Sequence, residues 1–164
     1  MMDDVQGQRG QQWLQDLMTV MGVSIQGVEV QRPQEDESCW LTISSEGLLP
    51  EEIGVLLGER GTVLDSIQYL TNITLNMGQP DDQQTAYTVE LAGYRAQRQA
   101  ELQEMAELAV QKVRETGEEY EMPPMSSAER RQLHTMMKSF EDLATESRGR
   151  EPDRRLVVRL ANPQ

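Results

Sequence analysis

The sequence predicts an α+β fold, built from helices and small sheets in two successive parts. Apolar residues recur at spacings of three and four in several segments, which is typical of helices, and alternate with polar residues in others, which is typical of strands. Charge then divides the 164-residue chain. Residues 125–164 hold eight basic and six acidic residues, whereas residues 1–124 hold seven basic and 22 acidic residues. We therefore expect two domains of different electrostatic character.

Composition excludes several classes of protein. No apolar run approaches the ~20 residues of a membrane span, and residues 1–10 lack the basic and then apolar pattern of a signal peptide. We therefore expect a cytoplasmic protein without a membrane partner. Cys39 is the single cysteine and His134 the single histidine, so no disulfide, metal or other cofactor is expected.

The first part of the chain is expected to mix helices and strands. Residues 1–10 are predicted to be disordered, and the helix that follows ends at Gly22. Apolar and polar residues alternate over residues 23–30 and 39–44, which predicts two strands. In the first strand the apolar residues change from odd to even positions across Gly27, which predicts a bulge at that residue. Residues 85–91 alternate as a third strand. Trp13 and Trp40 are expected in the core, as is Cys39.

The first part is organised around a loop between two predicted helices. Apolar residues end one helix at residues 53–57 and mark a second from residue 63, and Gly58, Glu59, Arg60 and Gly61 join them. Glycine permits the left-handed backbone that such a turn needs. Thr62 and Asp65 are predicted to cap the second helix. Bare backbone beside a helix N-terminus can receive a sugar-phosphate chain, and Arg60 adds a cation. The alternative is a helix corner in which the glycines serve geometry alone.

The order of elements over residues 11–94, with this loop at its centre, resembles the prokaryotic, type II form of the KH domain. That resemblance implies a three-stranded sheet covered by helices, and single-stranded nucleic acid clamped by the loop from Gly58 to Gly61. Val63, Ile67 and the strand from Cys39 are candidate groove residues, with plain core as the alternative. Glu59 departs from the family, whose loops usually carry Lys or Arg between the glycines, and an acid there would repel phosphate.

The second part of the chain follows a long helix predicted at residues 95–117, which we interpret as a connector packed partly on both parts. Residues 118–162 are expected to form the second domain. Its helix opens with a capping box from Ser126 to Glu129 and has a core-facing apolar stripe. One flank of that stripe is basic, carrying Arg130, Arg131, His134 and Lys138.

A final strand follows Gly149. It directs Leu156, Val158 and Leu160 inward and places Arg155 and Arg159 on its other face. We expect the helix flank and this strand face to converge on one ligand. Arg155 and Arg159 could instead be solvated strand residues, and His134 could serve packing.

The segments around Arg130 and His134, and from Thr145 to Arg159, resemble the R-three-H domain, which is named for an Arg and a His with three residues between them. With the preceding KH domain, the chain is similar to the Jag (SpoIIIJ-associated) family of bacterial RNA-binding proteins. The extra N-terminal domain of better-known members is expected to be missing.

The resemblance implies a bacterial, non-catalytic protein that binds single-stranded RNA, with single-stranded DNA as an alternative ligand. Its role would be post-transcriptional regulation or RNA chaperoning. The binding residues would be the loop and the basic surface of Arg130, Arg131, His134, Lys138, Arg155 and Arg159. A protein-interaction adaptor that docks a partner, such as a small KH-domain protein, is the rival hypothesis. Few residues suit catalysis, and no small-molecule substrate is expected.

Overall fold

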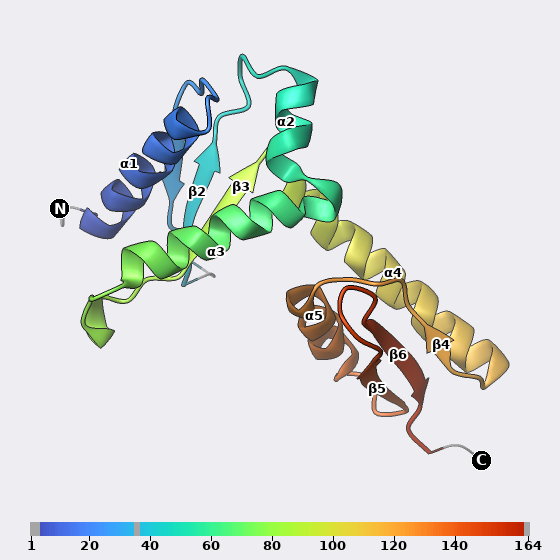
Figure 1. Cartoon of the computed structure of the whole chain (residues 1–164). Coiled ribbons are helices and arrows are strands. Elements are labelled where there is room, and N and C mark those ends of the chain that lie inside the picture. Colours follow the sequence, from blue (N-terminus) through green and yellow to red (C-terminus); the bar gives the residue numbers. More distant parts are fainter. Residues whose placement is uncertain (1–3, 35–36, 163–164) are drawn as a thin grey trace. The chain divides into compact units, whose positions relative to one another are not determined.

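The chain divides into two compact units, Met1–Arg95 and Ala96–Gln164, in a computed structural model that describes residues 4–34 and 37–162 (Figure 1). Each unit combines helices with a small sheet, which confirms the predicted α+β class. The elements of the first unit are α1 (Val5–Val20), β1 (Val28–Gln31), β2 (Cys39–Ile43), α2 (Pro50–Leu57), the short helix η1 (Glu59–Gly61), α3 (Thr62–Asn76), the short helix η2 (Asp81–Gln83) and β3 (Tyr87–Leu91).

Helices α1 and α3 cover the sheet of the first unit. Its described strands lie in the order β1-β2-β3, with β1 antiparallel and β3 parallel to β2. Alternate residues of β2 are buried, as the sequence predicted for this strand. Trp13 packs against the core from α1, while Trp40 is half-buried on the opposite side of β2 from the core residues Leu41 and Cys39.

The predicted disordered start is wrong for residues 5–10, which belong to α1. Asp4 caps this helix, because its Oδ1 accepts a hydrogen bond from the amide of Gly7 at 2.9 Å. A Cβ on Gly10 would lie 2.9 Å from both Leu41 Cδ1 and Tyr87 Cε1, so glycine lets the helix approach the sheet closely. The start of α1 is rich in Gly and Gln, so it resembles a linker in sequence, although Gly7 and Gly10 are buried in the structure. Residues 1–3 lie outside the described residues.

Three local predictions in the first unit are also wrong: the start of the first strand, the bulge at Gly27 and the cap formed by Thr62 and Asp65. Residues 23–27, all described, are not part of a strand, and β1 begins only at Val28. Gly27 forms no bulge; its carbonyl accepts a hydrogen bond from Ser44 N at 3.0 Å as the chain enters the sheet. Helix α3 has Gly61 as its N-cap without a side-chain cap. Asp65 instead accepts a hydrogen bond from Arg95 Nη1 at 2.6 Å.

Side chains of α3 cover the outer edge of β3, which the sequence did not predict. Asn72 donates to the carbonyl of Tyr87 at 2.9 Å and accepts from its amide at 2.8 Å. Asn76 bonds the backbone of Thr85 in the same way, and Gln68 accepts from the amide of Val89. Three amide side chains, spaced by four along the helix, therefore replace a missing neighbouring strand.

The second unit packs two helices against an antiparallel sheet. Its elements are α4 (Tyr94–Thr116), β4 (Tyr120–Glu121), α5 (Ser127–Met137), β5 (Leu143–Arg148) and β6 (Arg155–Leu160). The described strands lie in the order β4-β6-β5. Helix α4 begins at the end of the first unit, and its buried residues, from Leu102 to Val113, belong to the core of the second. Its role as a connector stays a prediction. None of the helices in the described part of the chain has the length and apolar character to cross a membrane.

Candidate functional site

Helix α5 supplies most of the predicted site residues. Ser126 caps the helix, because its Oγ accepts a hydrogen bond from Glu129 N at 3.2 Å. The Glu129 carboxylate binds Arg98 at 2.7 and 3.2 Å, so the predicted capping box is only half formed. Leu133 and Met137 are buried, as the apolar stripe predicted, which leaves the adjacent flank facing the β5–β6 hairpin.

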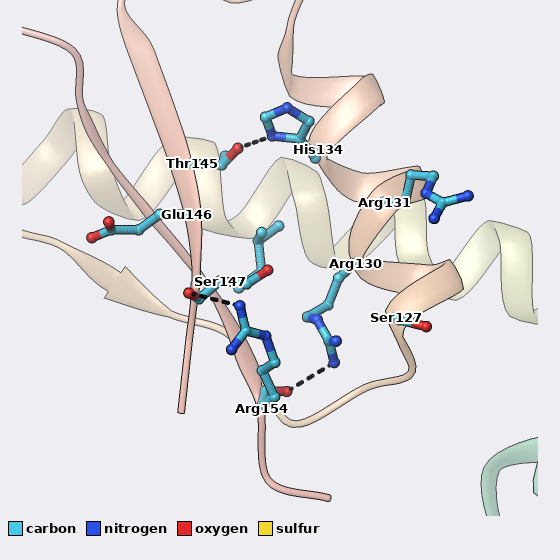
Figure 2. Close-up of a pocket in the computed structure, with 9 residues that line it drawn as sticks. Ser127, Arg130, Arg131, His134, Thr145, Glu146, Ser147 and Arg154 are labelled. Carbon is cyan, nitrogen blue, oxygen red and sulfur yellow. Dashed lines mark hydrogen bonds between the residues drawn. The ribbon is translucent and has the colours of Figure 1, made fainter. Parts of the chain in front are cut away.

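A basic pocket of about 420 Å³ lies between α5 and the β5–β6 hairpin (Figure 2). His134 Nδ1 is hydrogen-bonded to Thr145 Oγ1 at one end, and this bond ties the helix to β5. Ser127, in the first turn of α5, lies toward the other end. The lining residues are Ser127, Arg130, Arg131, His134, Thr145, Glu146, Ser147, Arg154 and Leu156.

The acidic side chain of Glu146 does not face the basic pocket. Strand pairing places Thr145 opposite Val158 and Ser147 opposite Leu156, so these four residues share the face that α5 covers. Glu146, between them, pairs with Val157 on the other face. Its Oε1 accepts a hydrogen bond from Arg148 Nε at 2.7 Å, and Figure 2 shows the side chain directed away from α5. The charged side chains on the α5 side of this pocket are therefore cationic.

Arg130 does not lie on an exposed helix edge, contrary to the sequence prediction. The residue is only 6% exposed. Its Nη1 donates to the carbonyls of Met125 at 2.6 Å and Arg154 at 3.4 Å, and its Nη2 donates to Glu151 Oε1 at 2.7 Å. The helical stripe alone could not reveal this, because the loop that buries Arg130 is more than 20 positions away in sequence.

The structure brings together some of the predicted cations and separates others. Arg131 and His134 are exposed and line the basic pocket. Lys138 caps the C-terminus of α5 and is not among the lining residues. Arg155 and Arg159 pair with Arg148 and Ala144, on the sheet face that carries Glu146.

The predicted convergence of the helix flank and the Arg155 strand face is therefore wrong. The cation that does join α5 is Arg154, which is not among the predicted binding residues. It stands just before β6, and its even number matches the parity of the inward-facing Leu156. That parity is the signal by which the sequence could have found it.

The loop from Gly58 to Gly61 is shaped by its glycines. Gly58 and Gly61 have φ values of 72° and 74°, in the left-handed region that favours glycine. A Cβ on Gly61 would lie 2.5 Å from the ring of Tyr94, and one on Gly58 would lie 2.5 Å from Val63 Cγ2. Glu59 and Arg60 between them are exposed. Geometry therefore requires both glycines, whatever the loop binds.

The candidate groove behind this loop consists partly of core. Ile67 is 4% exposed and Cys39 is fully buried, and burial raises the pKa of the Cys39 thiol. Val63 is half-buried. Residues 1–95 hold four basic and 15 acidic residues, a balance that opposes phosphate binding by this unit. No group of three or more residues suited to hold a metal ion occurs among the described residues.

Comparison with known families decides the identity of the second unit. Residues 100–160 match the family described as the R-three-H domain. The chain therefore contains an R-three-H domain. The match begins within α4, ahead of the start predicted at residue 118, in keeping with the contribution of that helix to the second core.

Curated relatives of the chain carry the name "RNA-binding protein KhpB". The protein from Clostridium symbiosum is 32% identical over 110 residues, which cover 67% of this chain and 49% of that protein. Those from Bacillus subtilis and Lactiplantibacillus plantarum are 29% and 30% identical, over 66% and 65% of this chain and 52% and 33% of theirs. The matches thus span about half or less of each relative. The resemblance to the Jag family is confirmed.

Proposed function

We propose that this chain binds single-stranded RNA through the basic pocket of its R-three-H domain. The observation that carries the proposal is the separation of charge between the two faces of the β5–β6 hairpin: Arg154 lies on the face that α5 covers, while Glu146 is directed to the other face. Arg131 and His134 of α5 line the same pocket. Such a pocket attracts phosphate, because cations release the counterions that surround a nucleic-acid backbone. The R-three-H match and the names of the relatives favour the same ligand.

The first turn of α5 adds to the attraction for phosphate. Ser127 lies at the start of this 11-residue helix and lines the basic pocket. Unpaired amides and the helix dipole favour an anion at such a position. A pocket of about 420 Å³ has room for a phosphate with its sugar. An extended single strand presents such a group without the bulk of a second strand.

We also propose that the first unit is a type II KH domain. The element order, with β2 parallel to β3 and a GxxG loop between α2 and α3, supports that assignment. The loop from Gly58 to Gly61 would then give RNA a second contact, through backbone amides and Arg60. We further propose that the protein acts without catalysis, in the cytoplasm, as an RNA regulator or chaperone.

Binding is tested by fluorescence anisotropy with a labelled oligouridylate, titrated against the whole chain at several salt concentrations. We expect the logarithm of the affinity to fall linearly with the logarithm of salt, by about 0.7 for each phosphate contact. Arg131→Ala with His134→Ala should weaken binding. Arg155→Ala removes a charge from the opposite face of the same domain and serves as the matched control. Equal losses in both variants, or no binding by the wild type, would contradict the proposal.

The loop is tested with the same probe. Arg60→Asp adds negative charge at an exposed position, so it should weaken binding if the KH loop contacts RNA. Glu46→Arg, on an exposed turn before α2, changes the charge by the same amount in the opposite direction away from the loop. Wild-type affinity in Arg60→Asp would restrict the proposed RNA contact to the R-three-H domain.

A protein-docking role is the second candidate, favoured by the exposed face of α3. Apolar side chains are exposed there at Tyr69, Leu70 and Ile73, and Met77 is exposed directly after the helix. Exposed apolar residues in contiguous rows mark interaction surfaces. Titration with a purified small KH-domain protein should give binding that Tyr69→Ser with Ile73→Ser abolishes. Val55→Ser, which changes an exposed apolar residue of α2, should leave it intact.

A further inference from the structure

Arg130 holds one of the two positions for which the R-three-H domain is named, yet its side chain is almost enclosed. We infer that Arg130 is a positioning residue, which holds the β5–β6 loop in place, and that Arg154 is the cation that meets the phosphate. This inference rests on the proposed function of the basic pocket. It assigns different tasks to two arginines that line the same pocket.

The guanidinium of Arg130 is committed to the protein. Its Nη1 and Nη2 reach two carbonyls and one carboxylate, which belong to Met125, Arg154 and Glu151. The side chains of Arg130 and Glu151 are 7% and 60% exposed, so the ion pair is closed on the Arg130 side and open on the other. Three hydrogen bonds thus engage this guanidinium within the protein, and its 7% exposure leaves little of it for a phosphate to reach.

The partners of Arg130 show what it holds. Met125 precedes α5, whereas Glu151 and Arg154 belong to the loop between β5 and β6, so Arg130 fastens that loop to the start of the helix. One acceptor is the carbonyl of Arg154 itself. The backbone of the proposed contact residue is thus held directly by Arg130, as the dashed line in Figure 2 shows.

Arg154 has donors left for a ligand. Its Nη1 donates to the carbonyl of Gly149 at 3.0 Å and its Nη2 to that of Ser147 at 3.5 Å, and no carboxylate pairs with it among the described residues. A guanidinium has five N–H groups, so several remain after these two bonds. The residue is half-exposed, unlike Arg130. Arg154 therefore offers an uncompensated charge that its own strand and loop hold in place.

A double-mutant cycle on the whole chain separates positioning from contact. The probe is the labelled oligouridylate, and the variants are Arg130→Gln, Arg154→Ala and the two combined. We expect Arg154→Ala to lower affinity about tenfold and the salt slope by about 0.7. Arg130→Gln and the double variant should each match it within about twofold, because both lose the same phosphate contact. Arg150→Ala, which removes an exposed charge from the same loop, should lose far less.

The opposite result would overturn the inference. If Arg130 contacts phosphate itself, the fold-losses in affinity of the two single variants multiply in the double variant. The salt slope of the double variant then falls by about 0.7 more than that of Arg154→Ala. Wild-type binding in Arg154→Ala would also overturn it. Absence of binding by the wild type would instead refute the proposed function of the pocket, so the two failures are distinguishable.

A second pair of variants covers the case in which Arg130→Gln does not fold. Glu151→Ala removes an exposed partner of Arg130, and Asp153→Ala removes the same charge from an exposed position in the same loop. If Arg130 positions the loop, Glu151→Ala should bind more weakly than Asp153→Ala, since it loosens the loop. If Arg130 is a contact that Glu151 masks, Glu151→Ala should bind more tightly than Asp153→Ala, and the inference fails.

Discussion

Gly61→Ala tests how far the GxxG loop depends on glycine for its own packing. Gly61 is buried with a φ of 74°, and a Cβ there would lie 2.5 Å from the ring of Tyr94. Alanine in the left-handed conformation costs about 1–2 kcal/mol. Displacement of a packed ring adds about 1–3 kcal/mol. We therefore expect the free energy of unfolding of the first unit to fall by roughly 2–5 kcal/mol.

Gly78→Ala provides the matched control. Gly78 has a φ of 75°, but nothing lies within 4 Å of the Cβ that alanine would add, so only the backbone cost of about 1–2 kcal/mol applies. Both tryptophans of the chain, Trp13 and Trp40, lie in the first unit. Tryptophan fluorescence during urea titration therefore follows the unfolding of that unit. Equal losses in the two variants, within about 0.5 kcal/mol, would refute the role given to Tyr94.

Three further predictions concern the first unit. Asn72→Ala removes two hydrogen bonds to the backbone of Tyr87 and should cost about 1–3 kcal/mol in the same titration; a loss below about 0.5 kcal/mol would contradict the covered edge of β3. The hydrogen bonds from Arg32 lower the pKa of Asp4, so Asp4 contributes stability above its unfolded pKa of about 3.9 and loses it as the pH falls through the folded value. Arg32→Ala should therefore cost up to about 1 kcal/mol at pH 7, since both side chains are partly exposed, and almost nothing near pH 2; equal losses at both would refute the assignment. Cys39 is fully buried with a raised pKa, so a thiol reagent should label it only as fast as the unit opens, and rapid labelling of the native protein would contradict its burial.

The sequence predicted elements whose signals are local. Helix α5 is indicated by its Ser126 cap and its apolar stripe, and both are present in the structure. Strand β5 gives no such signal, because its two apolar residues, Leu143 and Ala144, are adjacent rather than alternating and the four residues that follow are polar. Such a strand is stabilised by pairing with β6 rather than by an alternating pattern of its own.

The site was harder to predict than the helix that carries it. Helical geometry places Arg130 beside the apolar stripe, but it cannot tell which flank a distant loop will cover. The loop that contains Glu151 and Arg154 closes over this flank, which turns a predicted surface cation into a buried one. Long-range contacts of this kind leave no periodic trace in the sequence.

Net charge is a poor guide to where this chain would hold RNA, because strand alternation redistributes it. Residues 96–164 hold 11 basic and 13 acidic residues, an almost balanced composition. On the outer face of the sheet, Arg148 pairs with Glu119 at 2.7 Å, and Arg155 lies 3.7 Å from Glu121. The face toward α5 has Arg154 without a carboxylate partner among the described residues. A nearly neutral domain thus gains a cationic pocket, because its acids are directed to the face that already holds other arginines.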